Sequence, residues 1–275
     1  MTLPVDTLLG RAVEHQPCYS PQILTPIPRA PGRAALGLTG PWSGAGGDRW
    51  TGWELGWLDP DGRPRMAVLR AELPAQTPCL VESKSFKLYL NSYVRERLDG
   101  LAAVRERIAA DLMRAAGAAV AVELLEPSEW SRLAPQELPG VCIDAVDCRF
   151  DAAESVAADA LHGERGRIVV ERLHSHLLRS NCPVTGQPDW ASVLVDYHGP
   201  AIDRAGLLRY LLSFRELREF HEQCVERIFL DLAARCAPRT LLVEARYTRR
   251  GGLDINPWRA TPGHPSPVQK RHWRQ

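Results

Sequence analysis

The chain has 275 residues, 45% of them hydrophobic, and a formal net charge of +1 at pH 7. This length suits one large domain or two of ordinary size, and the near-zero charge excludes a protein that binds nucleic acid or membranes through a global field. The seven cysteines lack the spacing of a disulfide framework, and residues 1–16 contain no long apolar run. We therefore expect a cytoplasmic protein with reduced thiols, without a signal peptide or a membrane span.

The first half of the chain predicts two strands, one long helix and a third strand. Residues 51–58 and 64–69 are strand-like, and residues 95–116 repeat apolar side chains with the period of a helix. Gly117 is a suitable stop for that helix, and the apolar run 118–125 predicts the strand that follows.

Two further segments predict irregular structure. Residues 41–47 predict a loop, and their Gly44-Ala45-Gly46 is a poor dinucleotide fingerprint because no apolar strand precedes it. The proline-rich stretch 126–140 predicts a linker, which divides the chain into domains 1–134 and 135–275.

The second half repeats the pattern of the first. Residues 167–172 and 190–197 predict strands, residues 205–234 a helical region, and residues 240–247 a closing strand. Strands followed by helices and then strands indicate an α+β fold, with antiparallel sheets and helices on one face.

An internal echo supports two related modules. Tyr89-Leu90-Asn91-Ser92-Tyr93 reappears as Tyr210-Leu211-Leu212-Ser213-Phe214, 121 residues later, and Glu106-Arg107-Ile108 reappears as Glu226-Arg227-Ile228, 120 residues later. Such a long period indicates a duplicated domain. The second copy is expected to lack the run Glu82-Ser83-Lys84-Ser85, with Ala205-Gly206-Leu207-Leu208 in its place.

A thiol and a carboxyl group lie seven residues apart, at Cys182 and Asp189, with Pro183 and Pro188 between them. Proline fixes its own φ and restricts the residue before it, so the segment is stiff. A nucleophile and a proton donor at a set separation suit addition to a carbon–heteroatom multiple bond. The alternative is that Cys182 is only a small buried hydrophobe.

The run from Val81 to Tyr89 combines Glu82, Ser83, Lys84 and further polar residues. Glu82 and the serines suit a helix start, where the backbone amides and Lys84 would also hold a phosphate. A plain capped helix with solvated lysines is the alternative.

Two later runs have comparable chemistry. His221 and Glu222 are adjacent on a predicted helix, and a carboxylate there suits the N–H edge of a guanine-like base, although surface polarity explains the pair equally well. Arg249, Arg250 and Gly251 suit a phosphate approached by backbone, whereas the alternative is a basic turn after an edge strand.

The sequence also contains histidines and cysteines that could bind a metal. His174 and His176 would present both rings on one face of a strand, with Cys142 and Cys148 nearby in sequence. No Cys-x-x-Cys or His-x-x-Glu-His spacing accompanies them, so we predict no metal.

Together, these runs resemble the NADPH-dependent nitrile reductases of queuosine biosynthesis, the QueF family, in its long bimodular subgroup. The resemblance covers nearly the whole chain and is carried by the following segments: Pro21–Arg29, Glu82–Tyr89, Ser180–Trp190, Phe220–Glu222 and Arg249–Arg259. It implies tandem tunnelling-fold modules of strand–strand–helix–helix–strand–strand order, and reduction of 7-cyano-7-deazaguanine to 7-aminomethyl-7-deazaguanine with two NADPH.

The resemblance also implies roles for single residues. Cys182 would form a covalent thioimide, with Asp189 and His221 assisting proton movements. The remaining site residues divide into a substrate group, Val81, Glu82, Ser83, His221 and Glu222, and a cofactor group, Ser83, Lys84, Arg250 and Gly251.

A homodimer is expected because tunnelling-fold sheets close by pairing modules, and neither nucleic acid nor membrane is an expected partner. Two alternatives remain. One is a zinc-dependent cyclohydrolase of the same fold, with zinc on Cys182 or His176. The other is a purine-binding protein without catalysis.

Overall fold

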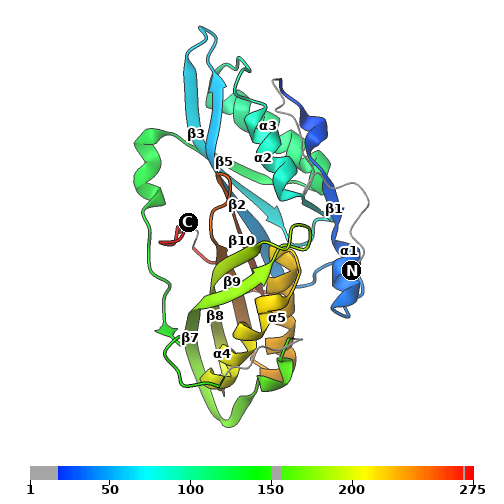
Figure 1. Ribbon diagram of the computed structural model, residues 1–275, viewed down its shortest axis with the longest axis vertical. Coiled ribbons are helices and arrows are strands. Elements are labelled where there is room, and N and C mark those ends of the chain that lie inside the picture. The colour runs from blue at the N-terminus through cyan, green and yellow to red at the C-terminus, as the bar shows by residue number, and fades with distance from the viewer. Residues whose placement is uncertain (1–17, 150–155, 269) are drawn as a thin grey trace. The chain divides into compact units, whose positions relative to one another are not determined.

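The computed structural model describes residues 18–149, 156–268 and 270–275 (Figure 1). The expectation for residues 1–16 lies outside this part of the chain. No helix among the described residues is long and apolar enough to cross a membrane. The chain divides into two compact units after Ala134, but Arg249–Ile255 belongs to the first unit and Ser43–Gly46 to the second.

In the first unit, two long antiparallel strands carry the sheet, in the order β5-β3-β2. A second, two-stranded pairing joins β1 to β4. The unit contains β1 (Pro26–Pro28), α1 (Arg29–Ala35), β2 (Ala45–Leu58), β3 (Pro64–Pro74), β4 (Cys79–Val81), α2 (Ser83–Asn91), α3 (Gly100–Ala116) and β5 (Ala121–Leu125). The first two residues of β2 fall in the second unit. Short 3-10 turns lie at η1 (Pro21–Ile23) and η2 (Pro127–Leu133).

In the second unit, the strand order is β10-β9-β8-β7-β6, antiparallel except for the short parallel pair β6–β7. Helices α4 and α5 lie together against this sheet (Figure 1). The elements are β6 (Val141–Cys142), η3 (Ala158–Ala160), β7 (Gly163–Asn181), β8 (Pro188–Ile202), α4 (Arg204–Leu212), η4 (Ser213–Glu216), α5 (His221–Cys236), β9 (Thr240–Tyr247) and β10 (Leu253–Ala260), of which Leu253–Ile255 falls in the first unit.

These elements confirm the predicted α+β class with antiparallel sheets. The order β7-β8-α4-α5-β9-β10 is the strand–strand–helix–helix–strand–strand order of a tunnelling-fold module. The first unit adds β1 and α1 before its two long strands and β4 between β3 and α2, and after β5 a 3-10 turn comes instead of a second closing strand. The closing strand at residues 240–247 was predicted with the bounds observed for β9.

Both long helices were predicted too long, for the same reason. Helix α3 begins at Gly100, not residue 95, because the backbone before it pairs with the end of β2 through Leu98 N–H donating to the Leu58 carbonyl at 2.9 Å. The region 205–234 is two helices, because Asn181 N–H at the end of β7 donates to the Leu217 carbonyl at 2.8 Å. Backbone engaged with a strand cannot continue a helix.

Two smaller predictions were also wrong. The loop predicted at 41–47 ends early, since β2 already begins at Ala45. The strand predicted at 118–125 begins at Ala121, because Gly117 ends α3 in the left-handed conformation, with φ 79°, and the chain needs three further residues to reach β3.

The internal echo corresponds to a repeated set of buried hydrogen bonds. The Tyr89 hydroxyl donates to Asp111 at 2.7 Å, and the Tyr210 hydroxyl donates to Asp231 at 2.6 Å. In both units the serine three residues after the tyrosine donates back to the tyrosine carbonyl, at 2.7 Å from Ser92 and 2.6 Å from Ser213. The repeated tyrosine and aspartate side chains therefore join the two helices of each unit.

The register of the echo differs from the sequence-based prediction at one point. Glu82 is the N-cap of α2, and Asp203, also 121 residues later, is the N-cap of α4 and accepts from Gly206 N–H at 2.8 Å. The counterpart of the Glu82–Ser85 run is therefore Asp203–Gly206, two residues earlier than expected. The capping carboxylate is kept in the second unit, and the serines and the lysine are not.

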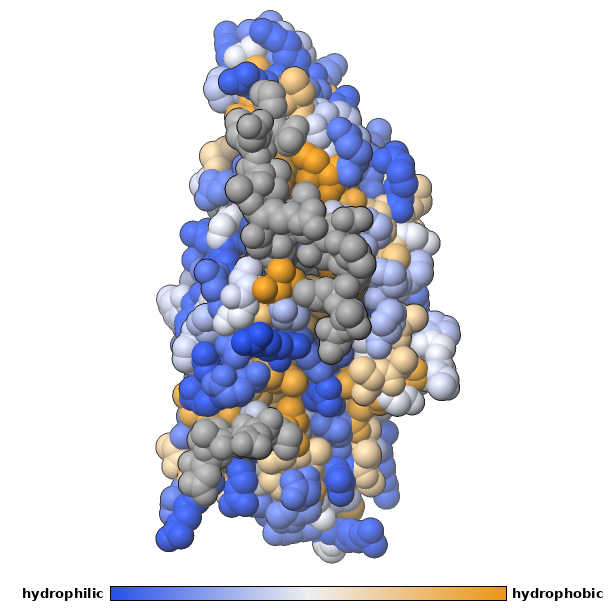
Figure 2. All heavy atoms as spheres, turned by 45° about the vertical axis from the view of Figure 1, so that its right-hand side comes forward, coloured by the Kyte–Doolittle hydropathy of each residue, from blue (hydrophilic) through white to orange (hydrophobic). Residues whose placement is uncertain are grey.

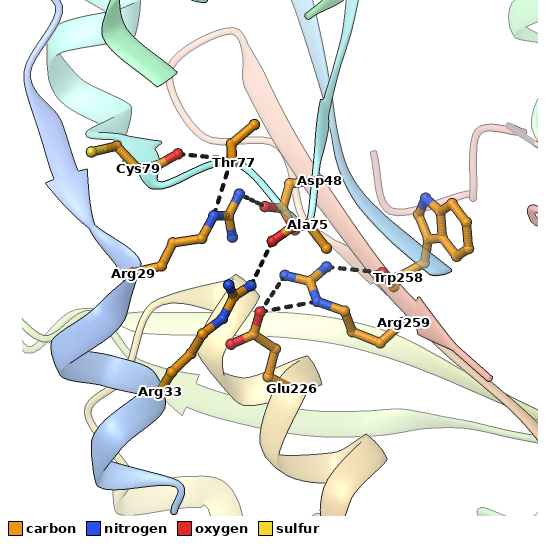
Figure 3. Close-up of polar contacts among 9 residues, drawn as sticks. All are labelled: Arg29, Arg33, Asp48, Ala75, Thr77, Cys79, Glu226, Trp258 and Arg259. Carbon is orange, nitrogen blue, oxygen red and sulfur yellow. Dashed lines mark hydrogen bonds and ion pairs between the residues drawn. The ribbon is translucent and has the colours of Figure 1, made fainter. Parts of the chain in front are cut away.

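A buried ion pair and two arginine hydrogen bonds fix the segment after β1 within the first unit (Figure 3). Arg29 contacts Asp48 at 2.5 Å and donates through Nε to the Thr77 hydroxyl at 3.1 Å, while Arg33 donates to the Ala75 carbonyl at 2.6 Å. Arg29 closes the proline-rich run near the start of the chain, so this part of the resemblance has a structural role.

The second unit has its own buried pair in the same view. Arg259 donates through Nε and one terminal nitrogen to the same Glu226 oxygen, at 3.1 and 2.9 Å, and to the Trp258 carbonyl at 2.8 Å (Figure 3). Removing one partner of such a pair leaves a buried charge and is strongly destabilising.

The protein surface mixes hydrophobic and hydrophilic side chains on the face drawn in Figure 2. Among exposed apolar residues, Val170 and Ile168 on β7 are 79% and 50% exposed. Of the described residues, none forms a strand on the second edge of β7 before Leu173, where β6 pairs.

Candidate active site

The predicted nucleophile lies in the connection between β7 and β8 of the second unit. These strands pair Ser180 with Asp189 and Asn181 with Pro188, so the hairpin ends where the Cys182 loop begins. Cys182 N–H donates to the Gln187 carbonyl at 2.8 Å, which closes the loop across its base. The predicted constrained segment therefore lies at the end of a hairpin, which the sequence analysis did not predict.

Cys182 is 8% exposed, so protein atoms surround most of its side chain and a small part of it is open to solvent. The loop turns at Gly186, whose φ of 67° favours glycine. The thiol is thus presented by a short loop on a long, well-paired hairpin, which limits its freedom to move.

The side chains of His221 and Asp189 are in contact within the second unit. Nε2 of His221 lies 3.2 Å from Oδ2 of Asp189, and their side chains are 15% and 4% exposed. His221 is the first residue of α5, where the free backbone amides favour negative charge nearby. Surface polarity therefore does not explain His221, since a buried carboxylate faces its ring.

Tyr247 completes this arrangement and was missed by the sequence analysis. Its ring stacks on His221 with centroids 3.7 Å apart and an angle of 11° between planes. Burial raises the pKa of Tyr247 well above its ordinary value, and the neighbouring Cys224 and Asp189 add to the shift. The stack fixes the plane of the imidazole, and in this plane Nε2 faces Asp189.

The second nitrogen of His221 is available for a ligand. Nδ1 is buried and has no hydrogen-bond partner among the described residues. Leaving a buried polar atom without a partner costs about 1–3 kcal/mol. A bound polar group would remove this cost.

Glu222 is the next residue on α5 and is 4% exposed. A carboxylate at the second position of a helix is stabilised by the free amides of the first turn. The start of α5 thus carries a buried carboxylate, Glu222, at the position after His221, which contacts Asp189.

The other substrate candidates lie in the first unit, at the end of β4 and the start of α2. Val81 pairs with Pro26 and is buried. Glu82 is 1% exposed and accepts from Lys84 N–H at 2.8 Å and from Ser85 N–H at 2.7 Å. Both oxygens of Glu82 therefore cap the helix, as the capped-helix alternative anticipated.

The cofactor candidates are also in the first unit, on two adjacent segments. A side-chain atom built at Gly251 would lie 3.3 Å from the Lys87 side chain, so the 249–252 turn runs close beside α2. Gly251 and Gly252 have φ of 59° and 78°, which glycine adopts without strain. Arg249 lies over the Trp53 ring, 5.3 Å from its centroid.

This basic region fits a phosphate-bearing cofactor. Lys84 and Lys87 are one helical turn apart on α2, and Arg250 follows Arg249 on the adjoining turn. Arginine forks and lysine ammonium groups are the usual partners of phosphate oxygens.

Metal-binding side chains gather elsewhere in the second unit. Ligand atoms of Cys142, His174 and His176 lie within 4.8 Å of one another, and so do those of Glu137, His176 and His272. Cys182 belongs to neither group. The described residues therefore do not place the predicted nucleophile among metal ligands.

Comparison with known proteins agrees with the resemblance drawn from the motifs. Residues 15–124 match the model of the nitrile reductase, 7-cyano-7-deazaguanine-reductase N-terminal family, and residues 188–265 match that of the QueF-like proteins. An NADPH-dependent 7-cyano-7-deazaguanine reductase of Stenotrophomonas maltophilia is 54% identical over 98% of this chain and 97% of its own length.

The chain belongs to the NADPH-dependent 7-cyano-7-deazaguanine reductase family. Relatives of the same name from Xanthomonas campestris and Bordetella avium are 54% and 50% identical, and each match covers 98% of this chain. A solved structure of an archaeosine synthase QueF-Like protein in the apo form matches 36% of this chain at 18% identity and a TM-score of 0.32. The two family models and the full-length relatives confirm the family predicted from the residues.

Proposed function

We propose that this protein reduces the nitrile of 7-cyano-7-deazaguanine to the aminomethyl group of 7-aminomethyl-7-deazaguanine, with two NADPH, in queuosine biosynthesis. The observation that carries the proposal is the Asp189–His221 contact of 3.2 Å, with Asp189 at the hairpin end that presents Cys182, in a chain so similar to reductases of that name. Identity of 54% over nearly the full length supports the same reaction.

Cys182 is the proposed nucleophile. A nitrile carbon is a weak electrophile, so the attacking group is a thiolate. Its sulfur bonds to the nitrile carbon, one carbon–nitrogen π bond breaks, and the nitrogen takes a proton, which gives a thioimide on Cys182. Two NADPH, bound one after the other, would each supply one hydride. After the first hydride and a proton the thiolate of Cys182 would leave to give an imine, and the second hydride and a proton would give the amine.

Asp189 and His221 are proposed to move the protons. Because their side chains are in contact, a proton taken from the Cys182 thiol can be shared between carboxylate and imidazole before it reaches the nitrogen. The Tyr247 stack keeps the ring of His221 oriented during these transfers. Tyr247 is therefore a positioning residue in this proposal.

Val81, Glu82, Ser83, His221 and Glu222 are proposed to bind the substrate. Glu222 and Nδ1 of His221 offer buried polar atoms for the polar edge of a deazaguanine. Glu82 contributes while it caps α2, since each carboxylate oxygen has a second lone pair beyond the one used by a backbone amide.

Ser83, Lys84, Arg250 and Gly251 are proposed to hold the cofactor. All four lie in the first unit, on α2 and on the turn that runs beside it. The cations would meet phosphate oxygens, and Gly251 would let the backbone come close to them.

The proposed organisation is a first tunnelling-fold domain, residues 1–134, with the Glu-Ser-Lys-Ser run, and a second, residues 135–275, with Cys182 and Asp189. We also propose a cytoplasmic homodimer without direct nucleic-acid contacts. All seven cysteines are free thiols, as a reducing compartment favours, and an open strand edge with two exposed apolar side chains on β7 suits pairing with a second copy.

Intact mass measurement tests the function directly. The protein is incubated with 7-cyano-7-deazaguanine without NADPH, and we expect a mass increase of one substrate that is lost in Cys182→Ala. Cys148→Ser is the matched control and should keep the adduct. Absence of an adduct in the wild type, or an adduct in Cys182→Ala, would refute the nucleophile, and absence of NADPH oxidation on adding both substrates would refute the reaction.

The cyclohydrolase alternative predicts zinc on Cys182 or His176. Among the described residues, His176 belongs to both groups of possible metal ligands and Cys182 belongs to neither. Because of His176, metal content alone does not separate the two reactions; the Cys182 adduct and NADPH oxidation do.

A further inference from the structure

A cluster of metal-binding side chains lies where β6, β7 and the C-terminal residues of the second unit meet. Cys142 on β6 pairs directly with His174 on β7, and His176 follows two positions later on the same strand. The ligand atoms of these three residues lie within 4.8 Å of one another. Around a tetrahedral Zn²⁺, with bonds of about 2.0–2.3 Å, ligand atoms lie roughly 3.5 Å apart. Small side-chain rotations would therefore close the group around an ion.

Both strand histidines are oriented as metal ligands are. Nδ1 of His174 lies 3.1 Å from the Pro139 carbonyl, and Nδ1 of His176 lies 2.9 Å from the Ser192 hydroxyl. Metal-binding histidines commonly use one ring nitrogen in such a contact, which fixes the ring and directs the other nitrogen at the ion. In both rings, Nε2 is left for that purpose.

A second and independent observation concerns His272. Its side chain is 4% exposed, and neither ring nitrogen has a hydrogen-bond partner among the described residues. The ring stacks on His176 with centroids 5.1 Å apart, and its ligand atom lies within 4.8 Å of those of His176 and Glu137. Buried polar groups are normally satisfied, so an imidazole with two unused nitrogens beside other metal ligands points to an absent partner.

The two groups of possible ligands share His176, and neither holds His272 together with Cys142 and His174. We propose that the second unit binds one Zn²⁺ through Cys142, His174 and His176, and that the ring of His272 moves towards the ion to become its fourth ligand. One thiolate and three imidazoles form a set typical of this borderline-soft ion. Glu137 lies at the margin of the site, where it already accepts from the Trp273 indole. The sequence analysis weighed Cys142, His174 and His176 but not His272, because 130 residues separate His272 from Cys142 and no short spacing connects them.

The ion would be structural. It would join β6 and β7 to the C-terminal residues, whose Gln275 donates to the Tyr247 carbonyl at 3.1 Å and to Asn256 at 2.6 Å. Arg274 reinforces the same attachment by donating to the His176 carbonyl at 2.9 Å. The site thus anchors the segment that packs on the backbone of Tyr247, the residue that stacks on His221.

Metal analysis of the full-length protein without an affinity tag tests the proposal. After removal of metal with a chelator, the protein is dialysed against micromolar free Zn²⁺, and bound zinc is measured by elemental analysis. We expect one zinc per chain, a Tm that rises with zinc, and at least tenfold weaker binding in His272→Ala and Cys142→Ser. Co²⁺ in place of Zn²⁺ should give a thiolate charge-transfer band that Cys142→Ser removes.

Cys148→Ser and His264→Ala are matched controls that should bind zinc as the wild type does, because neither residue belongs to the cluster. Cys142 is exposed, so its substitution tests binding even if a buried histidine variant fails to fold. Less than about 0.2 zinc per chain in the wild type, or loss of zinc in Glu137→Gln with full binding in Cys142→Ser, would overturn the proposal. None of these readouts depends on nitrile reduction.

Discussion

Replacing Glu82 by alanine should destabilise the first unit far more than the matched change in the second unit. The Glu82 carboxylate, 1% exposed, accepts two backbone N–H bonds at 2.8 and 2.7 Å, whereas Asp203 accepts one, at 2.8 Å. A lost N-cap costs about 0.5–2 kcal/mol, and a hydrogen bond to a charged acceptor contributes about 1.5–3 kcal/mol. We therefore expect a loss of about 2–4 kcal/mol in the free energy of unfolding for Glu82→Ala and about 1 kcal/mol for Asp203→Ala.

Urea unfolding and amide hydrogen exchange measure these losses. The amides of Lys84 and Ser85 should lose protection in Glu82→Ala, because their acceptor is gone. Glu82→Asp, which copies the cap of the second unit, should recover part of the stability. Equal losses in Glu82→Ala and Asp203→Ala, or unchanged exchange at Lys84 and Ser85, would show that Glu82 does not cap α2 and would refute this reasoning.

Three further predictions concern the second unit. Glu222→Gln should weaken binding of the deazaguanine by about 1–3 kcal/mol in calorimetry, since a charge-assisted acceptor is lost, and unchanged affinity would place Glu222 outside the substrate site. Tyr247→Leu should lower kcat with little change in KM while Tyr247→Phe keeps activity, because the stack on His221 needs a ring; equal activity of both variants would contradict the positioning role. Burial raises the pKa of the Cys236 thiol from 9.0 to about 11, so the unfolded chain releases this proton first and stability should fall as pH rises from about 9 to 11. Cys236→Ala should flatten that part of the stability profile, and an unchanged profile would argue against the shift.

The local sequence was sufficient to predict features that lie within a single helix, strand or loop. The period of apolar residues located α3 and β9, and Gly117 ended α3 where expected, because such features depend on a few neighbouring residues. The restricted backbone between Cys182 and Asp189 could be predicted for the same reason, because two prolines and a short spacing limit its conformations locally. The family, too, was readable from its motifs.

The tertiary structure decided the contacts that join distant residues. The breaks before α3 and α5 follow from backbone pairing with the ends of β2 and β7, which no helical period can indicate. The stack of Tyr247 on His221 and the meeting of His272 with His176 likewise depend on strands and helices packed together across the sequence. Periodicity and spacing report only on neighbours along the chain, whereas acid–base pairs and metal sites are formed by side chains that folding brings within a few ångströms.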